Sequence, residues 1–219
     1  MTEMNTKKQE RVAKNKASII TVVGLDLAGS SKRPSGFCRL QEKEAETAEL
    51  YSDQEILEAI RATKPKLIAI DAPLTLPKGR HCVEEDCDCA GGPHFRECDL
   101  ELRRMKIRVF PLTLGPMRAL TRRGMALVTA LDKMGYKTIE TYPGAAQDIW
   151  KIPRQKDPQG LKQGLKKFEL SSALDKKKIS VHELDAISCA LVAQLHLEKK
   201  SLILGQASEG LMILPQLSV

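Results

Sequence analysis

The sequence is poor in aromatic residues, which account for 4% of its 219 positions, and it contains a single tryptophan. The core is therefore expected to be aliphatic. Binding of single-stranded nucleic acid by stacking of bases on aromatic side chains is disfavoured. No apolar run reaches the length that a membrane span needs, and the polar first residues lack the apolar segment of a secretory signal. We therefore expect a cytoplasmic protein, with a disordered basic tail at residues 1–17 and one domain at residues 18–219.

Acidic residues are scarce in long parts of this basic chain, whose net charge is +7. Segment 103–123 carries seven basic residues and no acidic one, and segment 151–178 carries nine against three. By contrast, segment 84–101 carries seven carboxylates and one arginine. Two interpretations of the basic segments remain open. In the first, the basic segments are solvated helix faces. In the second, they form a surface that contacts nucleic-acid phosphates through residues such as Arg118 and Arg122.

Hydrophobic periodicity predicts a chain of mixed strands and helices. Apolar or β-branched runs predict strands at residues 19–26, 36–40, 48–51, 66–71 and 137–143. Apolar stripes at helical spacing predict helices at residues 52–63, 100–105, 116–135, 157–174 and 181–199. Three consecutive strands followed by alternating elements predict a mixed α/β sheet with helices on both faces. The tail at 209–215 fits either an edge strand or a covering segment.

Four carboxylates occupy unusual positions. Asp26 and Asp71 end predicted strands, Glu140 lies within one, and Asp185 lies in the first turns of the last helix. Carboxylates are disfavoured inside strands and are seldom buried unpaired. Acids that converge from neighbouring strands form a hard oxygen site for Mg²⁺ or Mn²⁺. The alternative explanations are turn formation by the strand-end residues, an arginine partner for Glu140 and a helix-dipole contact for Asp185.

Most of the cysteines cluster in one segment without periodicity. Four of the six fall within seventeen residues, and these are Cys82, Cys87, Cys89 and Cys98. His81 and His94 lie beside or among them. Clustered Cys and His in a cytoplasmic chain more often bind metal than form disulfides. We therefore expect a metal-binding loop at about residues 80–99, with a structural Zn²⁺ held by four cysteines or by three cysteines and one histidine. A disulfide pair and inert thiols are the alternatives.

Six motifs, in this order, together resemble one family: "GLDLAGS…SGFC", "IAIDAPLTLP", "FRECDLEL", "RRGMAL…LDKMGY", "IETYPGA" and "HELDAISCAL". They span roughly residues 19–195 and are similar to the domain-of-unknown-function 429 family, predicted nucleases of RNase H-like fold. The resemblance implies that Asp26, Asp71 and Asp185 are the catalytic, metal-binding acids. It also implies Glu140 as a fourth ligand or a base behind the ligands. Arg96 is expected either to reach a phosphate or to form a salt bridge with a nearby carboxylate.

The expected function is therefore that of a divalent-metal-dependent nuclease, which hydrolyses phosphodiester bonds of nucleic acid. The loop after Asp26 consists of small residues, so its backbone amides and Ser30 can approach a phosphate. A non-catalytic nucleic-acid-binding or scaffold module is the first alternative. The second is an actin-like nucleotide phosphotransferase, although such proteins use two domains of this kind and this chain has room for one.

Overall fold

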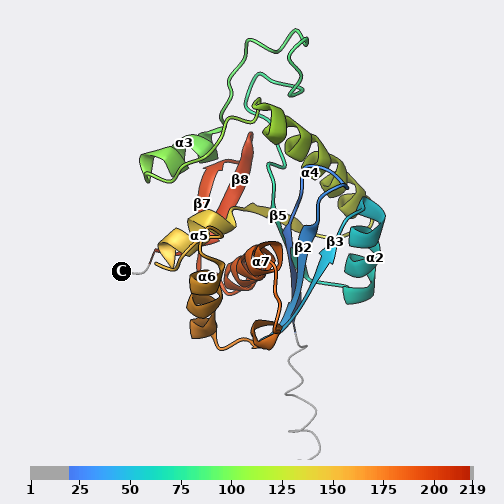
Figure 1. The fold of residues 1–219 in the computed structure, drawn as a ribbon. Coiled ribbons are helices and arrows are strands. Elements are labelled where there is room, and N and C mark those ends of the chain that lie inside the picture. The colour runs from blue at the N-terminus through green and yellow to red at the C-terminus, as the bar shows by residue number, and fades with distance from the viewer. Residues whose placement is uncertain (1–19, 218–219) are drawn as a thin grey trace, which may run out of the picture.

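The computed structural model describes residues 20–217, so the tail expected at residues 1–17 lies outside the described part. The described chain forms one eight-stranded sheet in the order β6-β3-β2-β1-β4-β5-β8-β7 (Figure 1). The strands are β1 (Thr21–Asp26), β2 (Ser35–Gln41), β3 (Glu44–Leu50), β4 (Leu67–Asp71), β5 (Thr138–Thr141), β6 (Ser171–Ser172), β7 (Ser201–Gln206) and β8 (Gly210–Pro215). Within residues 20–217, no helix is both long and apolar enough to cross a membrane.

Helices cover both faces of this sheet. They are α2 (Asp53–Thr63), α3 (Glu97–Arg104), α4 (Gly115–Lys133), α5 (Pro143–Ile149), α6 (Pro158–Leu165) and α7 (Val181–Leu197), with short 3-10 turns at η1 (Lys166–Phe168) and η2 (Ala173–Asp175). One apolar core joins the sheet to α6 and α7, and a second joins its other face to α2 and α4. A third cluster lies where α3 packs on β7 and β8.

The order and direction of the strands define the fold class. β2 is antiparallel to both β1 and β3, whereas β1, β4 and β5 run parallel to one another. The order β3-β2-β1-β4-β5 with these directions is that of RNase H-like sheets. The expected mixed α/β sheet with helices on both faces, of RNase H-like type, is therefore confirmed.

Side chains of the central strands alternate between the two cores. In β1, Val22 packs into the core of α7, whereas Leu25 packs into the core of α2 and α4. In β4, Ala69 faces α7 and Ile70 faces the opposite side. Successive residues of a strand point to opposite faces of the sheet. This alternation decides which side chains at the strand ends can meet α7.

Two glycines allow α7 to lie directly against the sheet. A Cβ atom at Gly24 of β1 would collide with the carbonyl oxygen of Ala186, and one at Gly36 of β2 would collide with that of His182. Residues 183–193 of α7 are all buried. The helix is therefore central to the fold, whereas the sequence predicts a helix with one apolar stripe.

The C-terminal part differs most from the expectation. The segment near residues 209–215 is β8, an interior strand that pairs in parallel with β5. The edge is formed by β7, which periodicity does not predict and which pairs antiparallel with β8. The partner strands β5 and β8 lie about seventy residues apart in the chain. Local pattern therefore carries no information about this pairing.

Candidate active site

Two of the predicted acids, Asp26 and Asp71, end neighbouring parallel strands. β1 and β4 pair in register, with Asp26 opposite Asp71. Asp26 is four residues beyond Val22, and Asp71 is two residues beyond Ala69, so the alternation puts both side chains on the face of α7. They are therefore neighbours at the carboxyl end of the sheet, where open α/β sheets place their ligands.

The third predicted acid, Asp185, belongs to the helix that covers this face. Its side chain is buried, and Gln147 Nε2 donates a hydrogen bond of 2.7 Å to its Oδ1. The same nitrogen of Gln147 donates to Ser188 Oγ at 3.1 Å. Both hydrogens of this amide are therefore used, and the Asp185 carboxyl is held in one orientation.

A histidine that the sequence analysis does not identify joins these acids. His182 Nδ1 lies 2.7 Å from Asp26 Oδ2. His182 precedes Asp185 by three residues, and residues at this spacing share one face of a helix. That spacing is a sequence signal for His182. Gln147 has no such signal, because it comes from α5 and meets Asp185 only in the folded chain.

The acids influence one another strongly. Burial raises the pKa of Asp71 well above its ordinary value, and the charges of Asp26 and Asp185 raise it further. Burial, followed by the charge of Asp26, raises the pKa of Asp185 to about 7. The hydrogen bond with Asp26 raises the pKa of His182. Crowded carboxyl groups with raised pKa values mark a place where a cation is stabilised.

The metal-free protein is expected to lose stability as the pH rises from about 4 to about 7. The pKa of Asp185 is about 7 in the folded chain and about 3.9 in an unfolded one. In this window the folded protein holds a proton that the unfolded chain has released, so stability falls, by at most about 1.4 kcal/mol per pH unit for one group. Asp185→Asn should flatten this slope. Thermal unfolding with chelator between pH 4 and 8 measures it, and identical slopes for both proteins would contradict the assignment.

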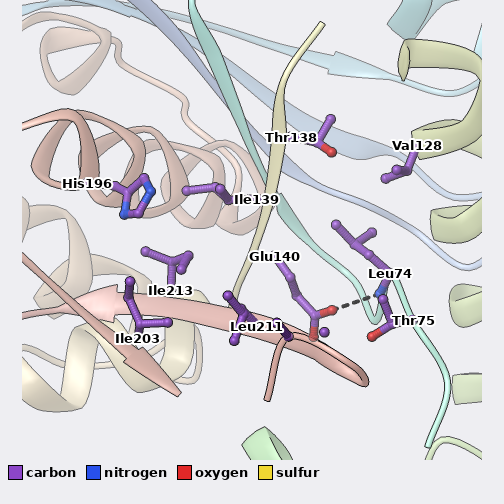
Figure 2. Close-up of a pocket in the computed structure, with 12 residues that line it drawn as sticks. Leu74, Thr75, Val128, Thr138, Ile139, Glu140, His196, Ile203, Leu211 and Ile213 are labelled. Atoms are coloured by element: carbon purple, nitrogen blue, oxygen red, sulfur yellow. Dashed lines mark hydrogen bonds between the residues drawn. The ribbon is translucent and has the colours of Figure 1, made fainter. Parts of the chain in front are cut away.

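Glu140, expected as a fourth ligand or a base, is instead the partner of Arg96 in the core. Arg96 Nη1 and Nη2 donate to its two oxygens at 2.6 and 2.5 Å. The backbone N–H of Leu74 donates to the same carboxylate at 2.8 Å, as Figure 2 shows. Glu140 is opposite Ile70 in the sheet, so it points away from α7. The structure thus corrects the catalytic interpretation of Glu140 and agrees with the alternative of an arginine partner.

Arg96 is also not available to a substrate. Its side chain is 1% exposed, and besides Glu140 it donates to Thr75 Oγ1 at 2.9 Å and to both oxygens of Asp99. All five N–H groups of the guanidinium therefore have acceptors. The phosphate-binding interpretation of Arg96 is corrected, and the salt bridge is the observed role. This cluster ties α3 and β5 to residues 74–75, which follow Asp71 closely.

The expected phosphate-binding arginines pair with acidic residues of the cysteine segment. Arg118 of α4 forms an ion pair with Glu85, and Arg122 lies 3.3 Å from Glu84. Each arginine therefore has a carboxylate neighbour in the free protein, and the side chains of Glu84, Glu85 and Arg122 reach solvent. Contact of Arg118 and Arg122 with nucleic-acid phosphates stays a prediction. Ser30 is exposed in the turn that follows β1, and its contact with a phosphate stays a prediction.

The cysteine loop, residues 80–92, lies between β4 and α3 and extends beyond the sheet near the start of α4 (Figure 1). Its possible metal ligands are His81 Nε2 and the Sγ atoms of Cys82, Cys87 and Cys89, which all lie within 4.8 Å of one another. Within residues 20–217, this is the only group of three or more possible metal ligands whose ligand atoms lie that close together. The carboxylate oxygens of the three aspartates are therefore more widely spaced.

Two residues of the expected zinc set lie elsewhere. Cys98 is fully buried in α3, within the apolar cluster that contacts β7 and β8. His94 Nδ1 lies 2.7 Å from Thr113 Oγ1, away from the cysteine group. Of the two expected ligand sets, the arrangement agrees with three cysteines and one histidine, which is His81, because Cys98 belongs to a different apolar core.

The strand order defines an RNase H-like sheet, and three aspartates lie at or near the carboxyl end of its central strands. Residues 24–209 match the family described as "Protein of unknown function (DUF429)", and the chain belongs to this family. The fold is similar to one described as "Thermus thermophilus RuvC structure", with 11% sequence identity, a TM-score of 0.47, and coverage of 82% of this chain and 97% of that chain. No curated protein matches the sequence significantly. The expected family is therefore confirmed.

Proposed function

We propose that this protein is a divalent-metal-dependent phosphodiesterase that hydrolyses nucleic acid. The observation that carries the proposal is the register of β1 and β4, in which Asp26 stands opposite Asp71 on the face that α7 covers. Asp185 of α7 completes the set, and its charge acts on Asp71. Carboxylate oxygens are the ligands that Mg²⁺ and Mn²⁺ prefer.

The residues present suit such a cation. Burial and mutual repulsion raise the pKa values of Asp71 and Asp185, and a neighbouring divalent cation reverses shifts of this kind. Held by Asp26, Asp71 and Asp185, Mg²⁺ or Mn²⁺ would lower the pKa of a water molecule and stabilise charge on phosphate oxygens.

Two further residues position these acids. Gln147 orients Asp185 through the bond to Oδ1 and leaves Oδ2 for a cation. His182 donates from Nδ1 to Oδ2 of Asp26, which leaves Oδ1 of Asp26 for a cation. The raised pKa of His182 means that its ring can also hold a proton next to the reacting groups.

The non-catalytic alternative requires the acids to serve as ion pairs. Within the described residues, these three aspartates form only one salt bridge, between Asp26 and His182. Asp185 has the uncharged Gln147 as its partner. Asp71 and Asp185 therefore have no salt-bridge partner within the described residues, and this favours a metal site over a scaffold. The net charge of +7 supports nucleic acid, a polyanion, as the substrate. The expected cytoplasmic location stays a prediction. Zinc, the second expected metal, is assigned to the cysteine loop and takes no part in hydrolysis.

The proposal is tested by metal titration and by cleavage. Calorimetric titration with Mg²⁺ or Mn²⁺ at neutral pH should show uptake of the cation. Labelled duplex, single-stranded, hybrid and branched substrates should then be incubated with Mn²⁺, and at least one should be cleaved in a reaction that chelator stops. If the protein shows neither uptake of the cation nor cleavage, the proposal is refuted and the protein belongs to the binding-module class.

A further inference from the structure

We propose that His81, Cys82, Cys87 and Cys89 bind one zinc ion in a closed structural site, distinct from the aspartates. Cys87 Sγ lies 3.3 Å from Cys89 Sγ and 3.2 Å from His81 Nε2. Cys82 Sγ lies 3.5 Å from Cys89 Sγ. Two sulfurs bound tetrahedrally to zinc at about 2.3 Å stand about 3.8 Å apart. Only small movements of these side chains are therefore needed to surround the ion.

The type and number of these ligands select the metal. Thiolate and imidazole together favour zinc, whereas Mg²⁺ and Mn²⁺ prefer oxygen. Three sulfurs and one nitrogen fill the four positions of a tetrahedral zinc, and no position is left for a substrate or a reactive water. The site is therefore structural, and its existence does not depend on the proposed nuclease activity.

The backbone of the loop is already folded around these ligands. The N–H of Ala90 donates to the carbonyl oxygen of Cys87 at 2.8 Å, and the N–H of Gly92 donates to that of Cys89 at 3.0 Å. Each of the two cysteines thus opens a tight turn. These turns bring both Sγ atoms to the same side as Cys82, as their distances show.

A buried arginine next to His81 supplies matching charge. Arg80 is 8% exposed and donates to the carbonyl oxygens of Ala90, Gly92 and Pro93. Its Nη1 is a buried nitrogen without a hydrogen-bond partner in the described chain. Zinc with three thiolates and a neutral imidazole carries one net negative charge. The cation of Arg80 is therefore favourable within a loop that holds such a centre.

The zinc site fastens the loop to the helix beside it. Glu84 and Glu85 lie between the ligands Cys82 and Cys87 and pair with Arg122 and Arg118 of α4. A loop fixed by the metal therefore holds two carboxylates against two arginines of the basic segment. Without the metal, this part of the loop would be held by the two ion pairs and by the buried side chain of Val83, and ion pairs at a surface contribute little.

One carboxylate competes with the assigned ligands. Asp88 Oδ1 lies 3.1 Å from His81 Nε2, and both side chains are largely exposed. Asp88 is a hard oxygen donor, whereas the neighbouring donors are sulfur and nitrogen. The assignment therefore gives the fourth position to His81, and variants of both residues distinguish the two.

Metal content of the full-length protein, purified without chelator, tests the site directly. Elemental analysis should find close to one zinc per chain. Cys87→Ser should lose the zinc, and His81→Asn should bind it more weakly in competition with a chromophoric chelator. His94→Asn and Asp88→Asn are matched controls and should retain the full equivalent. Zinc well below half an equivalent in wild-type protein reconstituted with Zn²⁺, or equal loss in His94→Asn and Cys87→Ser, would overturn the proposal.

Hydrogen exchange tests whether the ion holds the loop. Removal of zinc should accelerate amide exchange in residues 81–92 by about tenfold or more and leave β1 and β4 unchanged. This readout is independent of cleavage, so an inactive protein with a zinc-dependent loop would refute only the nuclease proposal. Unchanged exchange in residues 81–92 after zinc removal would refute the structural role of the site.

Discussion

Asp71→Asn should reduce Mn²⁺-dependent cleavage by on the order of 10²–10³-fold or more, the size of effect seen when a key electrostatic group is removed from an active site. Asparagine keeps the shape of aspartate but is a poor ligand for a hard cation. In metal-free protein the variant should melt at a higher temperature than the wild type. Burial and the charges of Asp26 and Asp185 raise the pKa of Asp71, which means that the ionised Asp71 carboxylate is unfavourable in the folded chain. A neutral asparagine avoids this unfavourable charge, so the folded state is more stable.

The matched control for this experiment is Asp132→Asn. Asp132 is an exposed carboxylate near the end of α4, so its replacement should change neither cleavage nor melting temperature. Wild type and both variants are compared on the same labelled substrates, with thermal unfolding measured in chelator. If Asp71→Asn cleaves as fast as the wild type, the cleavage does not come from this site, and the proposed function is refuted.

Arg96→Ala should destabilise the protein by about 3–5 kcal/mol, because it leaves buried carboxylates without their cation. The guanidinium is 1% exposed and bridges Asp99 of α3 to Glu140 of β5. Without it, two nearby carboxylates remain in the core, and each must take up a proton or admit water. The loss should therefore be smaller at acidic pH, where the carboxyl groups are protonated more easily.

Arg104→Ala provides the comparison. Arg104 pairs with Glu97 on the exposed side of the same helix, at 2.8 Å, and pairs of this kind contribute at most about 1 kcal/mol. Urea unfolding at pH 7 gives both free energies. Equal losses for the two variants would show that the buried cluster adds no more stability than a surface pair.

The sequence by itself indicated the acids at the strand ends. Asp26 and Asp71 each follow a short apolar run, and the alternation of a strand assigns their side chains to a face as soon as one neighbour is placed. The helical pattern places Asp185 in the first turns of the last strong helix, and the family resemblance groups it with the two strand-end acids. These assignments depend on contacts within a few residues, which local sequence pattern can express.

Glu140 shows where local pattern fails. It lies in a predicted strand like the aspartates, yet it stands opposite Ile70 and not opposite Asp71. A shift of one residue in register moves a side chain to the other face of a sheet. The pairing of β5 with β4 is a long-range contact, so the sequence could not decide whether Glu140 joins the acids or Arg96.

The cysteine loop divides in the same way. Spacing and composition indicated a metal-binding loop. Which cysteines can be ligands, however, depends on which of them are buried in an apolar core. Cys98 belongs to α3 and is buried between that helix and β7, a strand that comes a hundred residues later. In the proposed zinc site His81 takes the place of Cys98, because it directly precedes Cys82 and lies with the other three ligands.

Contacts between residues far apart in the chain were determined by the tertiary structure alone. His182 meets Asp26 because Gly24 and Gly36 let α7 lie against β1 and β2, and Gln147 meets Asp185 because α5 packs on α7. The class of the sheet and the kinds of chemistry came from the amino-acid sequence, since periodicity and residue type are local properties. The set of side chains in each site came from the packing, since hydrophobic burial brings together strands and helices regardless of their distance in the chain.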